Sequence, residues 1–138
     1  MTDTLGAQSS AVRLNAAVPT FLVADVGATA RWYSEILDFT TAGTVPGLEP
    51  YVYASLQRDG VELMLLQIDG YEKPDLTPAR QEGVWDVYIR MQGVHAFYDA
   101  VRTRTSMRSP LKKQPYADWE FEVQDPNGYI LVFSELTG

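Results

Sequence analysis

Hydrophobic and polar positions alternate along the chain in a way that predicts short strands and helices. Val18–Ala24 is almost entirely apolar and predicts a strand, and Asp25 after it is typical of a helix N-cap. Apolar residues then recur at helical spacing through 30–37. Tyr51–Leu56 and Val61–Gln67 predict two strands separated by an Asp-Gly turn. The first half of the chain is therefore expected to form a strand, a helix and further strands.

The second half repeats this order of elements. Trp85–Met91 alternates as a strand, and Val94–Arg104 predicts a helix. Two more strands are expected at Glu120–Gln124 and Tyr129–Glu135, and an Asp-Pro-Asn-Gly sequence between them is a strong turn signal. Each half is thus predicted to hold the same kinds of element in the same sequence order.

A constant offset relates the two halves. The turn glycines Gly60 and Gly128 lie 68 positions apart, and so do Val26 and Val94, close to the expected start of each helix. A repeat of this kind indicates an internal duplication. We therefore predict an α+β fold of two modules in one compact domain. The expected boundaries are a mobile tail over 1–15, a first module over 16–67, a linker over 68–83 and a second module over 84–138.

The composition excludes several classes of protein. With 46% hydrophobic and 21% charged residues, the chain is too apolar to be disordered. It has no apolar run long enough to cross a membrane and no secretory signal at its start. A net charge of −7 disfavours nucleic-acid binding, and the absence of cysteine excludes disulfides and thiolate chemistry. We expect a cytoplasmic protein with neither nucleic acid nor membrane as a partner.

Several stretches of the sequence resemble the glyoxalase/bleomycin-resistance/dioxygenase superfamily, also called vicinal oxygen chelate proteins. They are VPTFLVADVGATARWYSEILDF, DGVELMLLQ, DVYIRMQGVHAFYDAVRTR and FEVQDPNGYILVFSE. The resemblance, closest to metal-free bleomycin-resistance-like members, implies paired βαβββ modules that curl into a cup, with helices outside, in a homodimer. Asp38 stands where such proteins often have glycine after the helix. Aspartate tolerates the left-handed conformation, so we expect this helix cap to be kept.

The resemblance also implies four positions for metal ligands. Enzymes of the superfamily hold a divalent metal in the cup, usually through His and Glu from the first and last strand of each module. Here those positions hold Val18, Met64, Asp86 and Val132. A divalent cation needs several nitrogen or oxygen donors, and this set offers one carboxylate. The single histidine, His95, is expected away from the cup, so we predict no metal and no other cofactor.

Strand alternation identifies the residues expected to line the cup, because successive side chains point to opposite faces. Apolar alternate residues, Trp85 among them, are assigned to the helix side. Trp119 is also assigned there, but it begins a strand and is kept as a candidate for the rim of the cup. The candidate ligand-binding residues are Tyr51, Tyr53, Glu62, Met64, Asp86, Tyr88, Arg90, Trp119 and Glu122.

An aromatic and acidic cup suits a flat, cationic organic ligand. The favoured hypothesis is a small-molecule binding protein of the bleomycin-resistance type that sequesters its ligand unchanged and has no catalytic residues. One alternative is a superfamily enzyme (a lyase, isomerase or dioxygenase) in which Asp86 with Glu62 or Glu122 serves as a base or a sparse metal site. Another is a regulatory subunit with a vestigial cup.

Three points stay open at this stage. The same residues would face solvent if the sheet were flat. The modules can pair within one chain or between two. The basic segment 102–113 is either a solvated helix end and loop or a lip that attracts an anion.

Overall fold

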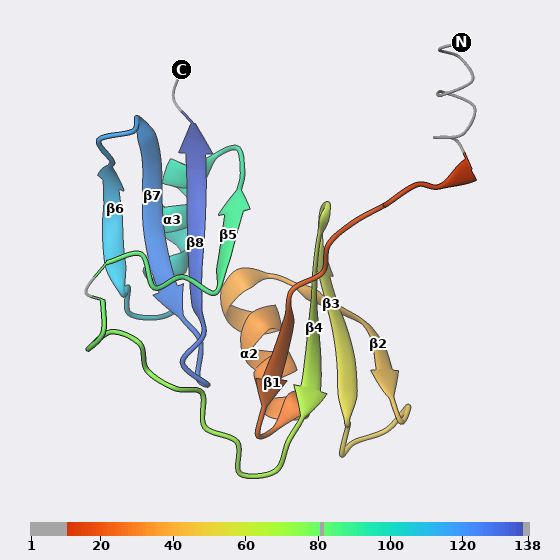
Figure 1. The fold of residues 1–138 in the computed structure, drawn as a ribbon. Coiled ribbons are helices and arrows are strands. Elements are labelled where there is room, and N and C mark those ends of the chain that lie inside the picture. The colour runs from red at the N-terminus through yellow and green to blue at the C-terminus, as the bar shows by residue number, and fades with distance from the viewer. Residues whose placement is uncertain (1–10, 81, 137–138) are drawn as a thin grey trace.

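The computed structural model describes residues 11–80 and 82–136, so most of the predicted tail lies outside the described residues. It contains two four-stranded mixed sheets, each with a helix on one face (Figure 1). The α+β prediction of two βαβββ modules is confirmed. In the described part of the chain, neither helix is both long and apolar enough to cross a membrane.

The two sheets have the same topology. In each, the first strand of the module runs parallel to the last, and the other neighbours are antiparallel. The first sheet has the order β1-β4-β3-β2 and the second β5-β8-β7-β6. The first module consists of β1 (Thr20–Val23), α2 (Val26–Leu37), β2 (Thr40–Val45), β3 (Tyr53–Arg58) and β4 (Val61–Gln67). The second consists of β5 (Val87–Arg90), α3 (Val94–Val101), β6 (Ser109–Lys113), β7 (Asp118–Gln124) and β8 (Ile130–Leu136).

The predicted offset is preserved in the strand register. Thr20 lies opposite Met64 in the first sheet, and Tyr88 lies opposite Val132 in the second. Both pairs are related by the same 68 positions as the turn glycines. The helices also begin 68 positions apart, but α2 has 12 residues and α3 has 8. The two modules therefore share one plan, and the helix of the second ends about one turn earlier than that of the first.

Two strands were not predicted, and both lie at sheet edges. β2 has the sequence TTAGTV and is almost wholly exposed, and β6 has the sequence SPLKK. Neither has the apolar alternation that marks a strand packed on a core. Each is held by backbone pairing to one neighbour, which the side chains do not reveal. The basic segment 102–113 therefore ends in a strand rather than in a loop.

Both predicted helix caps are confirmed. The Asp25 carboxylate accepts a hydrogen bond from the Ala28 N–H at 3.0 Å, which satisfies one free donor of the first turn of α2. Asp38 ends the same helix with φ 58° and ψ 35°, the left-handed conformation expected there. Its backbone N–H donates to the Tyr33 carbonyl.

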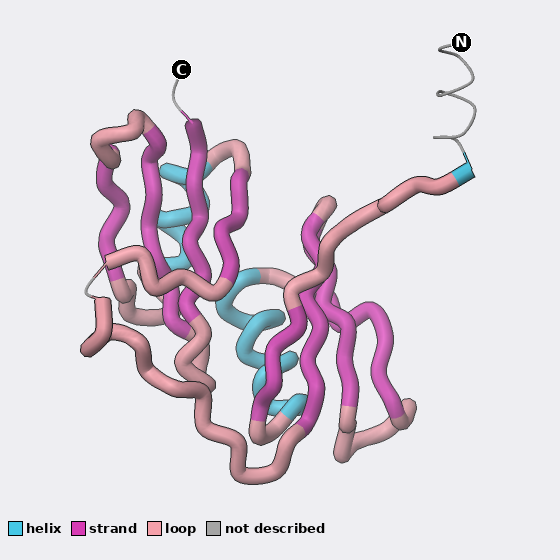
Figure 2. The backbone as a smooth tube through the Cα atoms, viewed as in Figure 1, coloured by secondary structure: helices cyan, strands magenta, loops and turns pink. Residues whose placement is uncertain are grey.

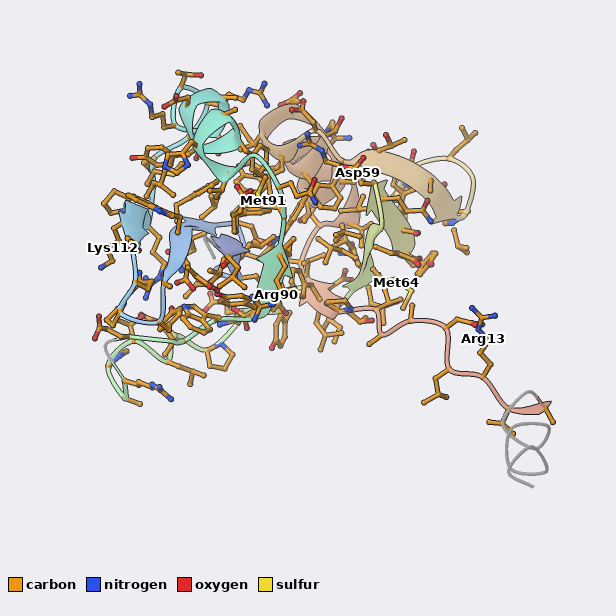
Figure 3. The ribbon with its side chains drawn as sticks, turned by 90° about the horizontal axis from the view of Figure 1, so that it is seen from above. Arg13, Asp59, Met64, Arg90, Met91 and Lys112 are labelled. Carbon is orange, nitrogen blue, oxygen red and sulfur yellow. The ribbon has the colours of Figure 1, made fainter. Side chains whose placement is uncertain are left out.

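One hydrophobic core joins the two modules. It includes Phe21 from β1, Phe121 from β7 and Tyr33 from α2. Figure 3 shows both helices on one side of the sheets, with Met64 and Arg90 on the opposite side. We call the face of each sheet opposite its helix the open face. Since the helix-covered faces share one core, the open faces of both sheets are turned away from it.

Contacts on the helix side hold the modules together within the chain. The Phe21 ring stacks on Tyr129 with centroids 4.1 Å apart. The buried Tyr33 hydroxyl donates to Asp125 Oδ2 at 2.7 Å, from α2 to the turn before β8. In the described residues, no hydrogen bond or ion pair joins an open-face side chain of one sheet to one of the other. A cup made of two open faces is therefore not closed within one chain.

Candidate functional site

The open face of the second sheet is built on a ladder of carboxylates. β7 alternates acidic and apolar residues, and its apolar residues enter the core. Asp118, Glu120 and Glu122 consequently project together on the opposite side. Asp118 and Glu120 are buried and Glu122 is half-buried, so this face differs from the solvated side of an ordinary sheet.

The hydroxyl of Tyr88 on β5 lies at the centre of a hydrogen-bond network. It is 2.8 Å from Asp118 Oδ2 and 2.9 Å from Ser134 Oγ, and it donates to Glu120 Oε2. Burial and the bond to Glu120 raise the pKa of Tyr88 well above its ordinary value, so the phenol stays protonated. The close Tyr88 hydroxyl, with help from Ser134 and Arg90, lowers the pKa of Asp118.

Two of the three carboxylates have a cationic partner. Arg90 Nη1 lies 3.3 Å from Asp118 Oδ2. Arg108 Nε lies 3.2 Å from Glu122 Oε1, and the Trp85 indole N–H donates to the other Glu122 oxygen at 3.0 Å. These pairs neutralise both ends of the ladder.

Glu120, in the middle of the ladder, has no cationic partner. It is 2% exposed, and its carboxylate accepts hydrogen bonds from the hydroxyls of Tyr88 and Tyr116, the latter at 2.7 Å. Within the part of the chain that the structure describes, no Lys, Arg or His forms an ion pair with it. Lys112 is its cross-strand neighbour on β6, but in the described residues its exposed side chain forms no ion pair with Glu120. Glu120 is therefore a buried acceptor supported only by neutral donors.

A hollow of about 530 Å³ opens over these residues. The loop that joins β4 to β5 (Figure 2) supplies one wall through Arg80, Glu82, Gly83 and Trp85. Trp85 is 39% exposed and its ring lies 5.1 Å from that of Tyr88. Trp85 and Tyr116 also line an adjoining hollow of about 340 Å³. The hollow is lined by Trp85, Arg108, Lys112, Tyr116, Glu120 and Glu122, among others.

The predicted ligand-binding residues divide between the two sheets. Tyr88, Arg90 and Glu122 lie on the open face just described. Tyr53, Glu62 and Met64 lie on the open face of the first sheet, which is turned elsewhere. Sequence alternation assigned these faces correctly within the strands, but it could not show that one chain keeps the two sets apart.

The acid–base set of the enzyme alternative is not brought together. Glu62 Oε2 accepts from the Ser55 hydroxyl at 2.8 Å on the first sheet. Asp86 precedes β5, and Glu122 is held by Arg108 and Trp85 in the second module. No geometry here supports a shared proton between Asp86 and either glutamate.

Two face assignments are wrong and one rim candidate is unsupported, and all three residues lie near or beyond strand ends. Tyr51 precedes β3 and packs against the core cluster, so it does not line the open face. Trp85 precedes β5, so its indole turns to the open face and Glu122 rather than to the helix. Trp119 lies on the helix side as expected, with its ring 4.8 Å from His95, and does not rim the hollow.

The candidate ligand-binding residues left out several that matter most in this hollow. Strand alternation places Glu120 on the open face, but Glu120 was not kept among the candidates. Tyr116 lies in the turn before β7, where no periodicity applies. The pairing of Arg108 with Glu122 depends on the unpredicted β6 and its approach to β7.

Comparison with known proteins decides the family. A sequence model of the Glyoxalase/Bleomycin resistance protein/Dioxygenase superfamily matches residues 13–133. The chain belongs to this superfamily. By sequence it matches none of the curated proteins with which it was compared.

Solved structures of the superfamily have the same fold. TioX from Micromonospora sp. ML1 superimposes with a TM-score of 0.69 at 15% identity, over 90% of this chain and 98% of its own. A bleomycin resistance determinant encoded on the transposon Tn5 gives 0.68 at 17%, over 91% and 100%. The bleomycin-binding protein of Streptomyces verticillus, in complex with copper(II)-bleomycin, gives 0.65 at 18%, over 92% and 98%. At these identities the likeness shows the fold alone.

The residues present do not fit the divalent metal of superfamily enzymes. Val18 and Val132 have no donor atom, and Met64 offers only a soft thioether. The Asp86 carboxylate accepts a backbone N–H of β8 at 2.8 Å and lies 3.4 Å from the Lys73 ammonium. In the described ranges, no three or more His, Cys, Asp or Glu side chains are grouped to hold a metal ion.

Proposed function

We propose that this chain is a small-molecule binding protein of the bleomycin-resistance type that sequesters an aromatic cation without altering it. The observation that carries the proposal is Glu120, a buried carboxylate with no cationic partner among the described residues. Burying a charge without a counter-charge costs free energy, and a ligand cation would offset that cost. Sequestration in the cytoplasm would protect a cell from such a compound.

The aromatic residues around Glu120 suit the rest of such a ligand. The faces of Trp and Tyr attract cations and stack on flat rings. The Trp85 indole is held by its hydrogen bond to Glu122, so less conformational entropy is lost when a ligand stacks on it. The fold shared with two proteins named for bleomycin supports this class of ligand.

We further propose that the functional form is a homodimer. The hollow beside Glu120 is open to solvent, and the two modules of one chain already share their helix-covered faces. The open face of the first sheet of a second copy is then available to cover the hollow. Two equivalent sites would result, because a symmetric dimer repeats each contact.

Glu120→Gln is expected to weaken the binding of a planar aromatic cation at least tenfold, since it keeps the shape of the side chain and removes the charge. The measurement is isothermal titration calorimetry with metal-free bleomycin and with N-methylacridinium. Glu35→Gln, the same change on the exposed surface of α2, serves as the control and should not alter affinity. Equal affinities of wild type and Glu120→Gln, or no binding of either probe at micromolar concentrations, would contradict the proposal.

Ligand binding is expected to be independent of divalent metal, because Val18, Met64 and Val132 supply no hard donor. Protein purified without chelator should contain no stoichiometric divalent metal by elemental analysis. Dialysis against EDTA should leave the affinity for N-methylacridinium unchanged. A tightly bound metal at one equivalent per chain would instead favour the enzyme alternative.

A further inference from the structure

The first sheet carries a continuous apolar row across its open face. Cross-strand register places Val45 of β2 opposite Tyr53 of β3, Tyr53 opposite Leu66 of β4, and Leu66 opposite Leu22 of β1. Side chains that lie directly opposite each other on neighbouring strands, on the same face of a sheet, are close enough to touch. The four strands therefore present one apolar band from edge to edge.

The duplicated position in the second sheet is polar throughout. There the row runs from Lys112 of β6 through Glu120 of β7 and Ser134 of β8 to Arg90 of β5. The backbone frame is the same in the two modules, as the register shows. The two copies have therefore diverged in the chemistry of this row: one is apolar, and the other contains the unpaired Glu120.

The apolar row is not covered by its own chain. Val45 is 53% exposed and Leu66 38% exposed, and Leu22 and Tyr53 are partly exposed. Met64, in the next row of the same face, is also partly exposed. The nearest charge on this face, Glu62, is two positions along β4 from Met64 and is held by Ser55. A charge-free apolar band that remains exposed is typical of a surface that covers a ligand or a partner.

We propose that the ligand is an amphipathic cation with two ends that are recognised separately. Its cationic group lies at Glu120, and its apolar body lies across the Leu22, Leu66, Tyr53 and Val45 row of a second copy of the chain. This inference rests on the proposed function, which supplies the binding site and the dimer. It adds that the two walls of the site select different parts of one molecule, so affinity depends on the length of the apolar part as well as on charge.

The test uses benzyldimethylalkylammonium ions whose alkyl chain grows from ethyl to octyl, studied by calorimetry below their micelle concentrations. They keep one aromatic ring and one cation while the apolar body lengthens. Wild-type affinity is expected to rise about fourfold for each added methylene that reaches the row. In Leu66→Ser the gain in affinity for each added methylene should be smaller than in wild type. The affinity for the ethyl compound should stay within about twofold of the wild-type value.

Leu76→Ser is the matched control, because Leu76 is similarly exposed but lies in the loop between the modules. It should keep the wild-type dependence on chain length. Unfolding of each variant in urea is compared with wild type, and Val45→Ser provides a second substitution in the row if Leu66→Ser unfolds.

The outcomes separate this inference from the proposed function. Binding that requires Glu120 but does not change with chain length, or a dependence that survives both row substitutions, overturns the amphipathic ligand and leaves the proposed function standing. Failure of every member to bind, when N-methylacridinium still binds, overturns the inference alone, and failure of both kinds of probe overturns the proposed function itself. Loss of the dimer in sedimentation by Leu66→Ser, with the dependence on chain length intact, assigns the row to subunit contact and also overturns the inference.

Discussion

Replacing Tyr129 by alanine is expected to lower the free energy of unfolding by about 4 kcal/mol. The ring stacks on Phe21 across the boundary between the modules, with centroids 4.1 Å apart. Its hydroxyl accepts from the Leu22 N–H at 3.0 Å and donates to the Leu22 carbonyl at 2.7 Å. The substitution removes packing and leaves the backbone of edge strand β1 without these partners. Urea unfolding followed by fluorescence measures the change.

Tyr129→Phe separates the two contributions. It keeps the stack on Phe21 and removes the bonds to Leu22, so we expect a cost of about 1–2 kcal/mol. Burial raises the pKa of Tyr129 from 10.0 to about 12. Between these values the unfolded chain loses the proton first, so the stability that wild type has over Tyr129→Phe should fall as pH rises. If Tyr129→Ala lowered the free energy of unfolding by less than about 1 kcal/mol, contacts other than those of Tyr129 would hold the two modules together.

The duplicated fold was predictable because its signals are local. The turn glycine Gly128, with φ 94°, is fixed by the geometry of a tight turn, and Asp25 is fixed by the free N–H groups of a helix start. These constraints act over a few residues and keep their spacing when a module is duplicated. β2 and β6 lack such signals, since an edge strand is stabilised mainly by backbone bonds to one neighbour, and its sequence remains nearly free.

The site was predictable only where strand alternation applies. Tyr88 and Glu122 are inside strands and lie on the expected face, whereas Tyr51 and Trp85 lie outside β3 and β5 and do not. Glu120 differs from Asp118 and Glu122 because those two carboxylates are paired with arginine. That pairing is set by residues distant in sequence, and no pattern along the chain reveals it.

Asp125→Ala is expected to cost about 3 kcal/mol in unfolding free energy. One carboxylate oxygen accepts the N–H groups of Asn127 and Tyr129 at 2.8 and 3.0 Å, and the other accepts the Tyr33 hydroxyl at 2.7 Å. Tyr33 is fully buried, so alanine would leave its hydroxyl without an acceptor or water. Urea unfolding at neutral pH gives the value, and a cost below about 1 kcal/mol would mean that another group takes over these donors.

Asp125→Asn should behave differently, because the amide oxygen can still accept both N–H groups and the Tyr33 hydroxyl can rotate to accept from the amide. Burial raises the pKa of Asp125 above 3.8, so the folded chain holds this proton more tightly than the unfolded chain. The stability that the proton contributes is complete below the ordinary pKa and is lost as pH rises through the raised one. Asp125→Asn lacks this loss, so its stability relative to wild type should increase with pH across that window. If the unfolding free energies of wild type and Asp125→Asn in urea changed with pH in the same way, burial would not raise the pKa of the Asp125 carboxyl as the geometry requires.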